Sequence, residues 1–370
     1  MSHEFRSLLR KVGSGPHTSQ NLTRTEAQAA MRLMLHQEAT PAQIGAFLIS
    51  HRIKRPTGEE LAGMADTYDQ LGPQLPELPN KTNAQRPIVF CYAYDGRSRT
   101  APLGPLVALT LASLNIPVIQ HGGDRVPTKE GVPLIELWEA LGVDWNPCPL
   151  ENVHTILETH GIGFVHLPQH FPLAQALMPY RDQIGKRPPL STLELMWSPY
   201  VGDQLLVCGY VHPPTEGMFR GAFELRNTRS FVTVKGLEGS CDLPRDRTAI
   251  IGYQEGDEFH RLTLAPRDYG FAASEVPLAS PADWAIDSLA TLQGTSSELT
   301  EALIWNAGFY LWRSQSTIDS LTDSQTDTQT DATTELKSAF DRVRAALKDG
   351  RVYQKLIDLQ QALSHDRGQL

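Results

Sequence analysis

The sequence of 370 residues is long enough to bury a large core and to form two lobes. Hydrophobic residues make up 41% and charged residues 20%, as in ordinary globular proteins. The formal net charge of −9 argues against a protein that coats nucleic acid along a broad basic face, although it leaves a local basic cleft open. The 4 cysteines are scattered without a C-x-x-C pair, which indicates incidental thiols in a reducing compartment.

No secretory signal or membrane span is expected. Residues 1–13 lack the apolar core of a signal peptide. The apolar run at 102–119 is broken by Asn115 and Pro117, which favours a buried helix followed by a short strand over a membrane span. We therefore expect a cytoplasmic protein with no membrane contact.

Three capping boxes predict three consecutive helices near the N-terminus. Apolar residues recur at helical spacing behind each box. We expect residues 1–75 to form a helical domain, followed by a proline-rich hinge at 76–86. The boxes are Thr23 with Glu26, Thr40 with Gln43, and Thr57 with Glu60.

From residue 87 onward, strand-like apolar runs alternate with helical ones, which is typical of a mainly parallel sheet covered by helices. Two late runs, at 248–254 and 259–265, indicate a hairpin. The segment 313–335, rich in Ser, Thr, Asp and Gln, is expected to be a disordered or extended loop. The predicted fold is α/β: an N-terminal helical bundle plus a larger α/β domain at 87–370.

Three cationic or glycine-containing turns follow predicted strands, at residues 95–100, 121–131 and 180–187. Ligands of open α/β sheets bind beyond the carboxyl ends of the strands, so converging turns would form a basic pocket. Surface turns also collect charges without any ligand, and the pattern alone leaves convergence open. No G-x-S-x-G, P-loop or H-E-x-x-H motif is present. The cations of the pocket would be Arg97, Arg99, Arg125, Lys129 and Arg181.

These turns and their surroundings resemble the anthranilate phosphoribosyltransferase family. The similarity runs from "LTRTEAQAAMRLML" through "HGGDRVPTKEG" to "APRDYGF" and the closing helices, nearly the whole chain. The resemblance implies the nucleoside-phosphorylase type of fold used by class II phosphoribosyltransferases. It also implies a glycosyl or phosphoribosyl transferase that forms a homodimer through its helical domains.

The resemblance implies a phosphate-binding cleft with a non-standard donor loop. The Gly-Thr-Gly-Gly-Asp loop of the family aligns with residues 92–96, where Tyr92 and Tyr94 replace small residues. Arginine side chains are therefore expected to grip the phosphate in place of backbone amides. The residues expected around it are Asp95, Gly96, Arg97, Arg99, Thr100, His121, Gly122, Arg125, Lys129 and Gly131.

Acceptor and metal sites also follow from the resemblance. Arg181 matches the arginine that binds the aromatic acid acceptor, and His170 stands one place before the family's acceptor-side histidine. The family holds Mg²⁺ partly through an adjacent Asp-Glu pair. Cys241 and Asp242 replace that pair, so Asp242 and the upstream Glu238 are the expected ligands. Because Mg²⁺ prefers hard oxygen ligands, the altered pair predicts a weakened magnesium site.

Two functions stay open, besides a paralogue with no ligand. The first is a transferase with an unusual donor, which needs positioning and charge stabilisation but no nucleophile. The altered loop argues against true anthranilate phosphoribosyltransferase activity. The second is a non-catalytic paralogue that binds a nucleotide or single-stranded nucleic acid in the same basic cleft. Tyr92 and Tyr94 would then stack on bases.

Overall fold

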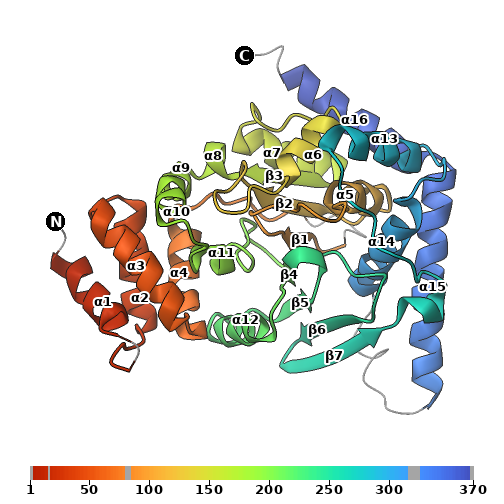
Figure 1. Ribbon diagram of the computed structural model, residues 1–370. Coiled ribbons are helices and arrows are strands. Elements are labelled where there is room, and N and C mark those ends of the chain that lie inside the picture. Colours follow the sequence, from red (N-terminus) through yellow and green to blue (C-terminus); the bar gives the residue numbers. More distant parts are fainter. Residues whose placement is uncertain (1–2, 16, 80–84, 316–325, 367–370) are drawn as a thin grey trace.

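The computed structural model describes residues 3–15, 17–79, 85–315 and 326–366. A helical bundle lies beside a larger α/β domain with a sheet at its centre, and the last helices cover the side of the sheet away from the bundle (Figure 1). The predicted architecture, an N-terminal bundle followed by a mainly parallel α/β domain, is confirmed.

The bundle contains the helices that the capping boxes predict. Each box is formed in full: the threonine side chain accepts from the backbone three residues on, and the glutamate or glutamine side chain there accepts in return. Gly63 lets α4 approach α2 closely, since a Cβ at this position would lie 2.1 Å from the Arg24 carbonyl oxygen. The helices are α1 (His3–Gly13), α2 (Arg24–Leu35), α3 (Pro41–Lys54) and α4 (Gly58–Leu71).

The sheet has seven strands in the order β3-β2-β1-β4-β5-β6-β7. The first five are parallel, and β6 and β7 form the predicted antiparallel hairpin. The strands are β1 (Ile88–Cys91), β2 (Val118–Gly122), β3 (Ile162–His166), β4 (Leu205–Gly209), β5 (Ser230–Val234), β6 (Ala249–Glu255) and β7 (Glu258–Leu264).

Helices cover both faces of this sheet. The most apolar one, α5, is almost entirely buried, because α14 and α16 pack over the side that faces away from β2 and β3. Within the described residues, no helix is long and apolar enough to cross a membrane. The helices are α5 (Gly104–Ser113), α6 (Leu134–Ala140), α7 (Leu150–His160), α12 (Pro213–Leu225), α13 (Pro281–Leu292), α14 (Thr300–Gln315), α15 (Thr326–Lys348) and α16 (Arg351–Asp366).

Four short helices between β3 and β4 join the α/β domain to the bundle. These are α8 (Leu167–His170), α9 (Pro172–Gln175), α10 (Met178–Ile184) and α11 (Leu190–Leu193). α10 packs against α3 and α11 against α4. The Tyr180 hydroxyl donates to the side chain of Gln37 at 2.5 Å, which ties the two parts together. Residues after β3 therefore pack against the bundle.

The segment expected as a loop at 313–335 is largely helical at its ends. Residues 313–315 finish α14, and α15 begins at Thr326, while 316–325 lie outside the described residues. The polar start of α15 continues without a break into an amphipathic stretch in which Leu336, Phe340 and Val343 are buried. Burial of that later stretch is what favours the helix, because polar composition alone does not. Part of the predicted hinge, 80–84, also lies outside the described residues.

Candidate ligand site at the strand ends

The loops that follow β1 and β2 are joined by their backbones. The N–H groups of Arg97 and Gly131 donate to the carbonyls of Val132 and Asp95, both at 3.1 Å, and the Val132 N–H donates back to Arg97 at 2.8 Å. A Cβ on Gly96 or on Gly131 would come within 2.5–2.6 Å of the opposite backbone, so only glycine fits at either position. The first two predicted turns thus meet through their backbones, and their glycines serve the contact between them.

The loop after β5 sends a carboxylate into the first loop. Glu238, with a φ of 54°, accepts hydrogen bonds from the backbone N–H groups of Ser98 (3.2 Å), Arg99 (3.1 Å) and Thr100 (3.0 Å). It also accepts from the Thr100 hydroxyl at 2.9 Å. We call these four donors the amide nest. Burial raises the pKa of Glu238, but the hydrogen bonds outweigh burial and lower the pKa to about 2.

A second carboxylate of the same loop binds beside the nest. Asp242 accepts from the Leu103 N–H at 3.0 Å, at the start of α5, and from the guanidinium of Arg97. Burial raises the pKa of Asp242, and Arg97 offsets only part of that effect. Arg97 is 4% exposed and lies 3.8 Å from Glu238. Its guanidinium also donates to Thr100 and Ser240.

The other predicted arginines are also paired with carboxylates. Arg125 pairs with Glu136 at 2.6 Å, while Arg99 is 78% exposed and lies 3.5 Å from Glu238. Arg187, the last residue of the third predicted turn, pairs with Asp95 at 2.6 Å. The expectation that arginine side chains replace the backbone amides is therefore corrected. Backbone N–H groups are the anion donors of the first loop, and the arginines neutralise carboxylates of the protein itself.

Lys129 differs from these arginines. It is exposed, and within the described residues it has no ion-pair partner. Its neighbours Thr128 and Glu130 both have positive φ, 86° and 50°, a conformation that side chains with a Cβ rarely adopt. Among the residues that the structure describes, Lys129 is therefore the one unpaired cation of the second turn, and it lies on a strained backbone.

Four predicted residues in or next to the first two turns face the interior. Tyr92 and Tyr94 are 4% and 3% exposed. The Tyr94 hydroxyl lies 2.5 Å from Nδ1 of His121, whose ring also packs against Trp197. Burial lowers the pKa of His121 to about 3, so this ring is neutral at physiological pH and offers no charge to a phosphate. Gly122 is buried as the last residue of β2.

The two predicted acceptor residues, Arg181 and His170, are bonded to other residues of the protein. Arg181 and Glu194 are both buried and form an ion pair. His170 accepts from the His166 N–H at Nδ1 (3.0 Å), and its Nε2 lies 2.9 Å from the Cys148 carbonyl. Sequence reasoning missed Glu194, although a lone acid in the apolar run "PPLSTLELMW" is a signal for a buried cationic partner.

A cavity of about 610 Å³ opens between the second turn and α9–α10. Its walls are mostly apolar, with charged groups from Asp124, Arg125 and Asp182. The remaining lining residues are Pro127, Pro172, Gln175, Ala176, Met178 and Pro179. Sequence reasoning did not predict this cavity, because its two walls lie about fifty residues apart in the chain.

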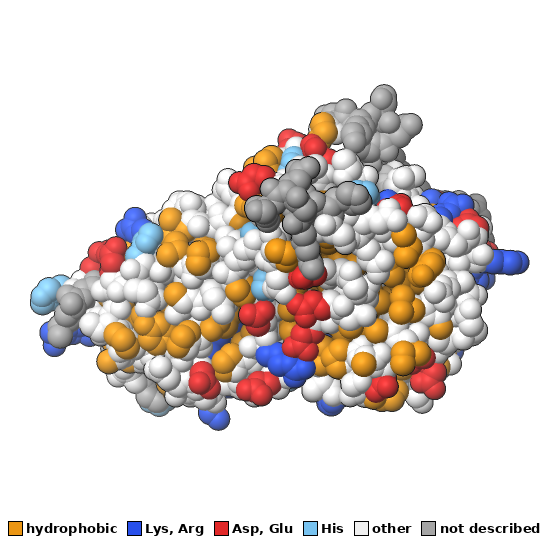
Figure 2. Space-filling model, turned by 90° about the horizontal axis from the view of Figure 1, so that it is seen from above, with side chains coloured by type: hydrophobic (Ala, Val, Ile, Leu, Met, Phe, Trp, Pro, Cys, Tyr) orange, Lys and Arg blue, Asp and Glu red, His pale blue; other side chains and the backbone are white. Residues whose placement is uncertain are grey.

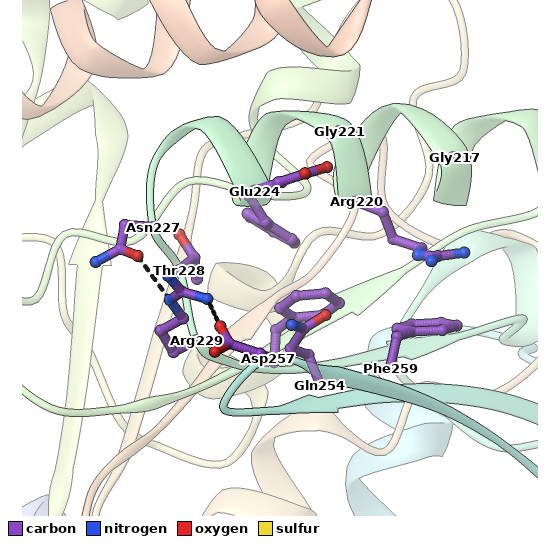
Figure 3. Close-up of a pocket in the computed structure, with 12 residues that line it drawn as sticks. Gly217, Arg220, Gly221, Glu224, Asn227, Thr228, Arg229, Gln254, Asp257 and Phe259 are labelled. Atoms are coloured by element: carbon purple, nitrogen blue, oxygen red, sulfur yellow. Dashed lines mark hydrogen bonds and ion pairs between the residues drawn. The ribbon is translucent and has the colours of Figure 1, made fainter.

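A second cavity, of about 530 Å³, lies between α12 and the β6–β7 hairpin, away from the predicted turns (Figure 3). The guanidinium of Arg220 lies 3.8 Å from the ring centre of Phe259. Arg229 bridges Asn227 and Asp257 at the other end. Its charged groups are largely engaged with one another, and we assign this cavity no role.

The residues present do not fit a magnesium ion. Within the described residues, no group of three or more His, Cys, Asp or Glu side chains is arranged to hold a metal. Glu238 is engaged by the amide nest and Asp242 by Arg97 and Leu103. Cys241 contributes no oxygen, and its thiol points at the carbonyls of Cys91 and Val207.

Two family models match the sequence. The helical bundle domain of a glycosyl transferase family matches residues 6–72, and the a/b domain of that family matches residues 98–353. The chain belongs to this glycosyl transferase family. The family expected from the sequence is thereby confirmed.

Relatives of similar length share about a quarter of their residues with this chain. An anthranilate phosphoribosyltransferase of Synechococcus sp. (strain CC9902) is 28% identical over 360 residues, covering 95% of this chain and 94% of the relative. An uncharacterized protein of Aquifex aeolicus is 28% identical over 232 residues, covering 63% of this chain and 68% of its own length.

Solved structures share the fold. Anthranilate phosphoribosyltransferase from Thermus thermophilus superposes with a TM-score of 0.74 at 22% identity, covering 96% of this chain and 99% of that one. The Saccharomyces cerevisiae enzyme, in complex with PRPP and Mg, superposes with a TM-score of 0.76 at 16% identity, covering 98% of each chain. At these identities the likeness establishes the fold, and what those enzymes bind does not carry over by itself.

Proposed function

We propose that the chain is a phosphoribosyltransferase-like protein that binds a phosphate-bearing ligand where the loops after β1 and β2 meet. The observation that carries this proposal is the amide nest, which holds both oxygens of a carboxylate through three N–H groups and one hydroxyl. Consecutive N–H groups are a common anion site, and phosphate oxygens accept the same hydrogen bonds as carboxylate oxygens. A phosphate would bind in exchange for Glu238.

Lys129 is the cation that we propose for the ligand. It is exposed beside Gly131, whose N–H ties the second turn to Asp95 of the first loop. Backbone strain at Thr128 and Glu130 supports this role, since strained residues gather at ligand sites. The buried residues next to the nest would hold the two loops in position without contacting the ligand. These are Asp95, Gly96, His121 and Gly122.

The proposed acceptor side differs from that of an enzyme acting on an aromatic acid. Arg181 is neutralised by Glu194, and both are buried, so this guanidinium is not free to receive a carboxylate. The 610 Å³ cavity beside the second turn is the proposed acceptor entrance, with proline and Met178 walls suited to an uncharged ring. We therefore propose a transferase-type site without true anthranilate phosphoribosyltransferase activity.

Isothermal titration with PRPP and with inorganic pyrophosphate tests the proposal, each with Mg²⁺ and with EDTA. We expect binding of both anions, weakened roughly 5- to 20-fold by Thr100→Val, which removes one hydroxyl donor, and similarly by Lys129→Met. Lys337→Met, on an exposed face of α15, is the matched control. Absence of heat with both anions at millimolar concentration would overturn the proposal.

The alternative, a paralogue that binds nucleic acid, has less support. Tyr92 and Tyr94 are buried and offer no stacking surface to bases. On the face shown in Figure 2, Lys and Arg side chains are scattered among acidic ones and form no basic stripe among the residues that the structure describes. Titration with single-stranded DNA at several salt concentrations tests the alternative. DNA affinity that falls steeply with salt, together with no binding of pyrophosphate, would favour it.

We also propose a homodimer formed through the helical bundle, as the resemblance implies. Ile53, on α3, is 71% exposed and gives the surface of the bundle an apolar position at which the proposal can be tested. Light scattering after gel filtration should give twice the mass of 41.0 kDa for the wild type. Ile53→Asp should shift that mass toward the monomer, whereas a monomeric wild type at micromolar concentration would refute the proposal.

A further inference from the structure

The guanidinium of Arg97 lies between the two carboxylates that were expected to hold a metal. It contacts Asp242 directly, is 3.8 Å from Glu238, and donates to the Thr100 hydroxyl, which in turn donates to Glu238. Arg97, Glu238 and Asp242 have side chains only 4%, 6% and 1% exposed. Two acids are thus held almost out of water against one internal cation.

We infer that Arg97 is a built-in replacement for the divalent cation at this site, so that the loops keep their arrangement without any metal. Buried carboxylates are strongly unfavourable unless a cation or hydrogen-bond donors neutralise them. A guanidinium stays protonated at every physiological pH and offers a fork of N–H donors that suits carboxylate oxygens. It therefore supplies the positive charge that a metal would otherwise supply to the two carboxylates.

The backbone holds this cation in place. Arg97 exchanges two backbone hydrogen bonds with Val132, and Gly96 and Gly131 pack in direct contact on one side of it. The main chain is thus fixed at both loops, and the side chain between them is only 4% exposed. A metal would have to displace it from Asp242.

While Arg97 occupies the space between the carboxylates, the remaining oxygen atoms do not form a coordination sphere. Glu238 is occupied by the amide nest, and the other Asp242 oxygen faces the Tyr92 hydroxyl at 3.5 Å. Mg²⁺ requires an octahedral set of oxygen ligands and gives up its waters reluctantly. The inference concerns the empty protein and a bare metal ion, so it stands whether or not the proposed phosphate ligand binds.

Metal titration of Arg97→Met tests the inference. Removing the guanidinium leaves Asp242 buried without a counter-charge, which should lower Tm by roughly 5–10 °C. Millimolar Mn²⁺ or Mg²⁺ should restore about half of that loss or more, because the ion now fits between the carboxylates. The double variant Arg97→Met/Asp242→Asn should not respond to metal. The wild-type Tm should be insensitive to both ions.

Arg99→Met is the matched control. Arg99 also lies within 3.5 Å of Glu238 but is 78% exposed and does not contact Asp242, so its loss should create no response to metal. If Arg97→Met fails to fold, the inference can still be tested by measuring Mn²⁺ binding to the wild type with electron paramagnetic resonance. Stoichiometric Mn²⁺ binding by the wild type that Asp242→Asn abolishes would overturn the inference. An Arg97→Met variant that folds but ignores metal would overturn it as well.

Discussion

Replacing Glu238 by glutamine should open the amide nest. The amide keeps one acceptor oxygen, but it loses the charge and turns an NH₂ group toward N–H donors. An anion entering the nest no longer has to displace a carboxylate that belongs to the protein. The variant should therefore bind pyrophosphate more tightly than the wild type, while being less stable.

The magnitude follows from the pKa of the carboxyl group. Lowering this pKa from 4.5 to about 2 corresponds to at most about 3 kcal/mol of stabilisation of the ionised form. The Glu238 side chain is itself buried, but its donors Ser98 and Arg99 are exposed, and solvent screening around them reduces this to roughly 1–2 kcal/mol. The same free energy, released to an incoming anion, equals a gain in affinity of roughly 5- to 30-fold.

Calorimetric titration with pyrophosphate in EDTA measures the affinity, and urea unfolding measures the stability. Glu258→Gln on β7, 74% exposed, makes the same charge change away from the site and should alter neither. The pH dependence has a defined sign. Because the folded-state pKa is depressed, the stability from Glu238 is present above pH 4.5 and is lost as pH falls toward 2. Glu238→Gln with unchanged pyrophosphate affinity and stability would refute the reasoning.

Three further predictions concern the support of the site. Arg181→Met should lower the free energy of unfolding in urea by about 3–5 kcal/mol, because it leaves Glu194 buried and unpaired. Arg181→Met/Glu194→Leu should recover most of that loss. Equal stability of the single and double variants would contradict this prediction. Gly96→Ala should lower stability by about 2 kcal/mol or more, the scale of an overpacked contact, whereas Gly217→Ala on α12, where a Cβ meets open space, should be neutral or stabilise by up to about 1 kcal/mol. The imidazole of His121 should not titrate between pH 8 and pH 5 in NMR spectra. Its pKa is depressed to about 3, so the protein should lose stability as pH falls from 6.5 toward 3. His121→Phe should reduce this loss of stability at acidic pH. A His121 midpoint near 6.5 would refute its burial as a neutral ring.

Local signals in the sequence predicted most of the fold. The three capping boxes and the alternation of apolar runs depend on residues a few positions apart, and each is formed as expected. The start of α15 was missed for the opposite reason. Its polar residues carry no periodic signal, and their helix is stabilised by the buried stretch that follows.

The site was predictable only in part. The sequence placed the turns at strand ends, where they meet. It did not show that Glu238, almost 140 residues beyond the first loop, reaches the N–H groups of Ser98 to Thr100. Charges on turns were interpreted as ligand-binding partly because carboxylate partners such as Glu238 and Asp242 lie far away in the chain. Two partners lie nearer, Glu136 for Arg125 and Glu194 for Arg181, and Glu194 is a lone acid in an apolar run.

Backbone amide NMR of the wild type, titrated with pyrophosphate in the presence of EDTA, tests the central claim most directly. If the amide nest receives the phosphate, the N–H resonances of Ser98, Arg99 and Thr100 shift together and saturate, while those of the β6–β7 hairpin stay in place. Saturable binding that leaves these three resonances unmoved, or no binding at all, would contradict the account.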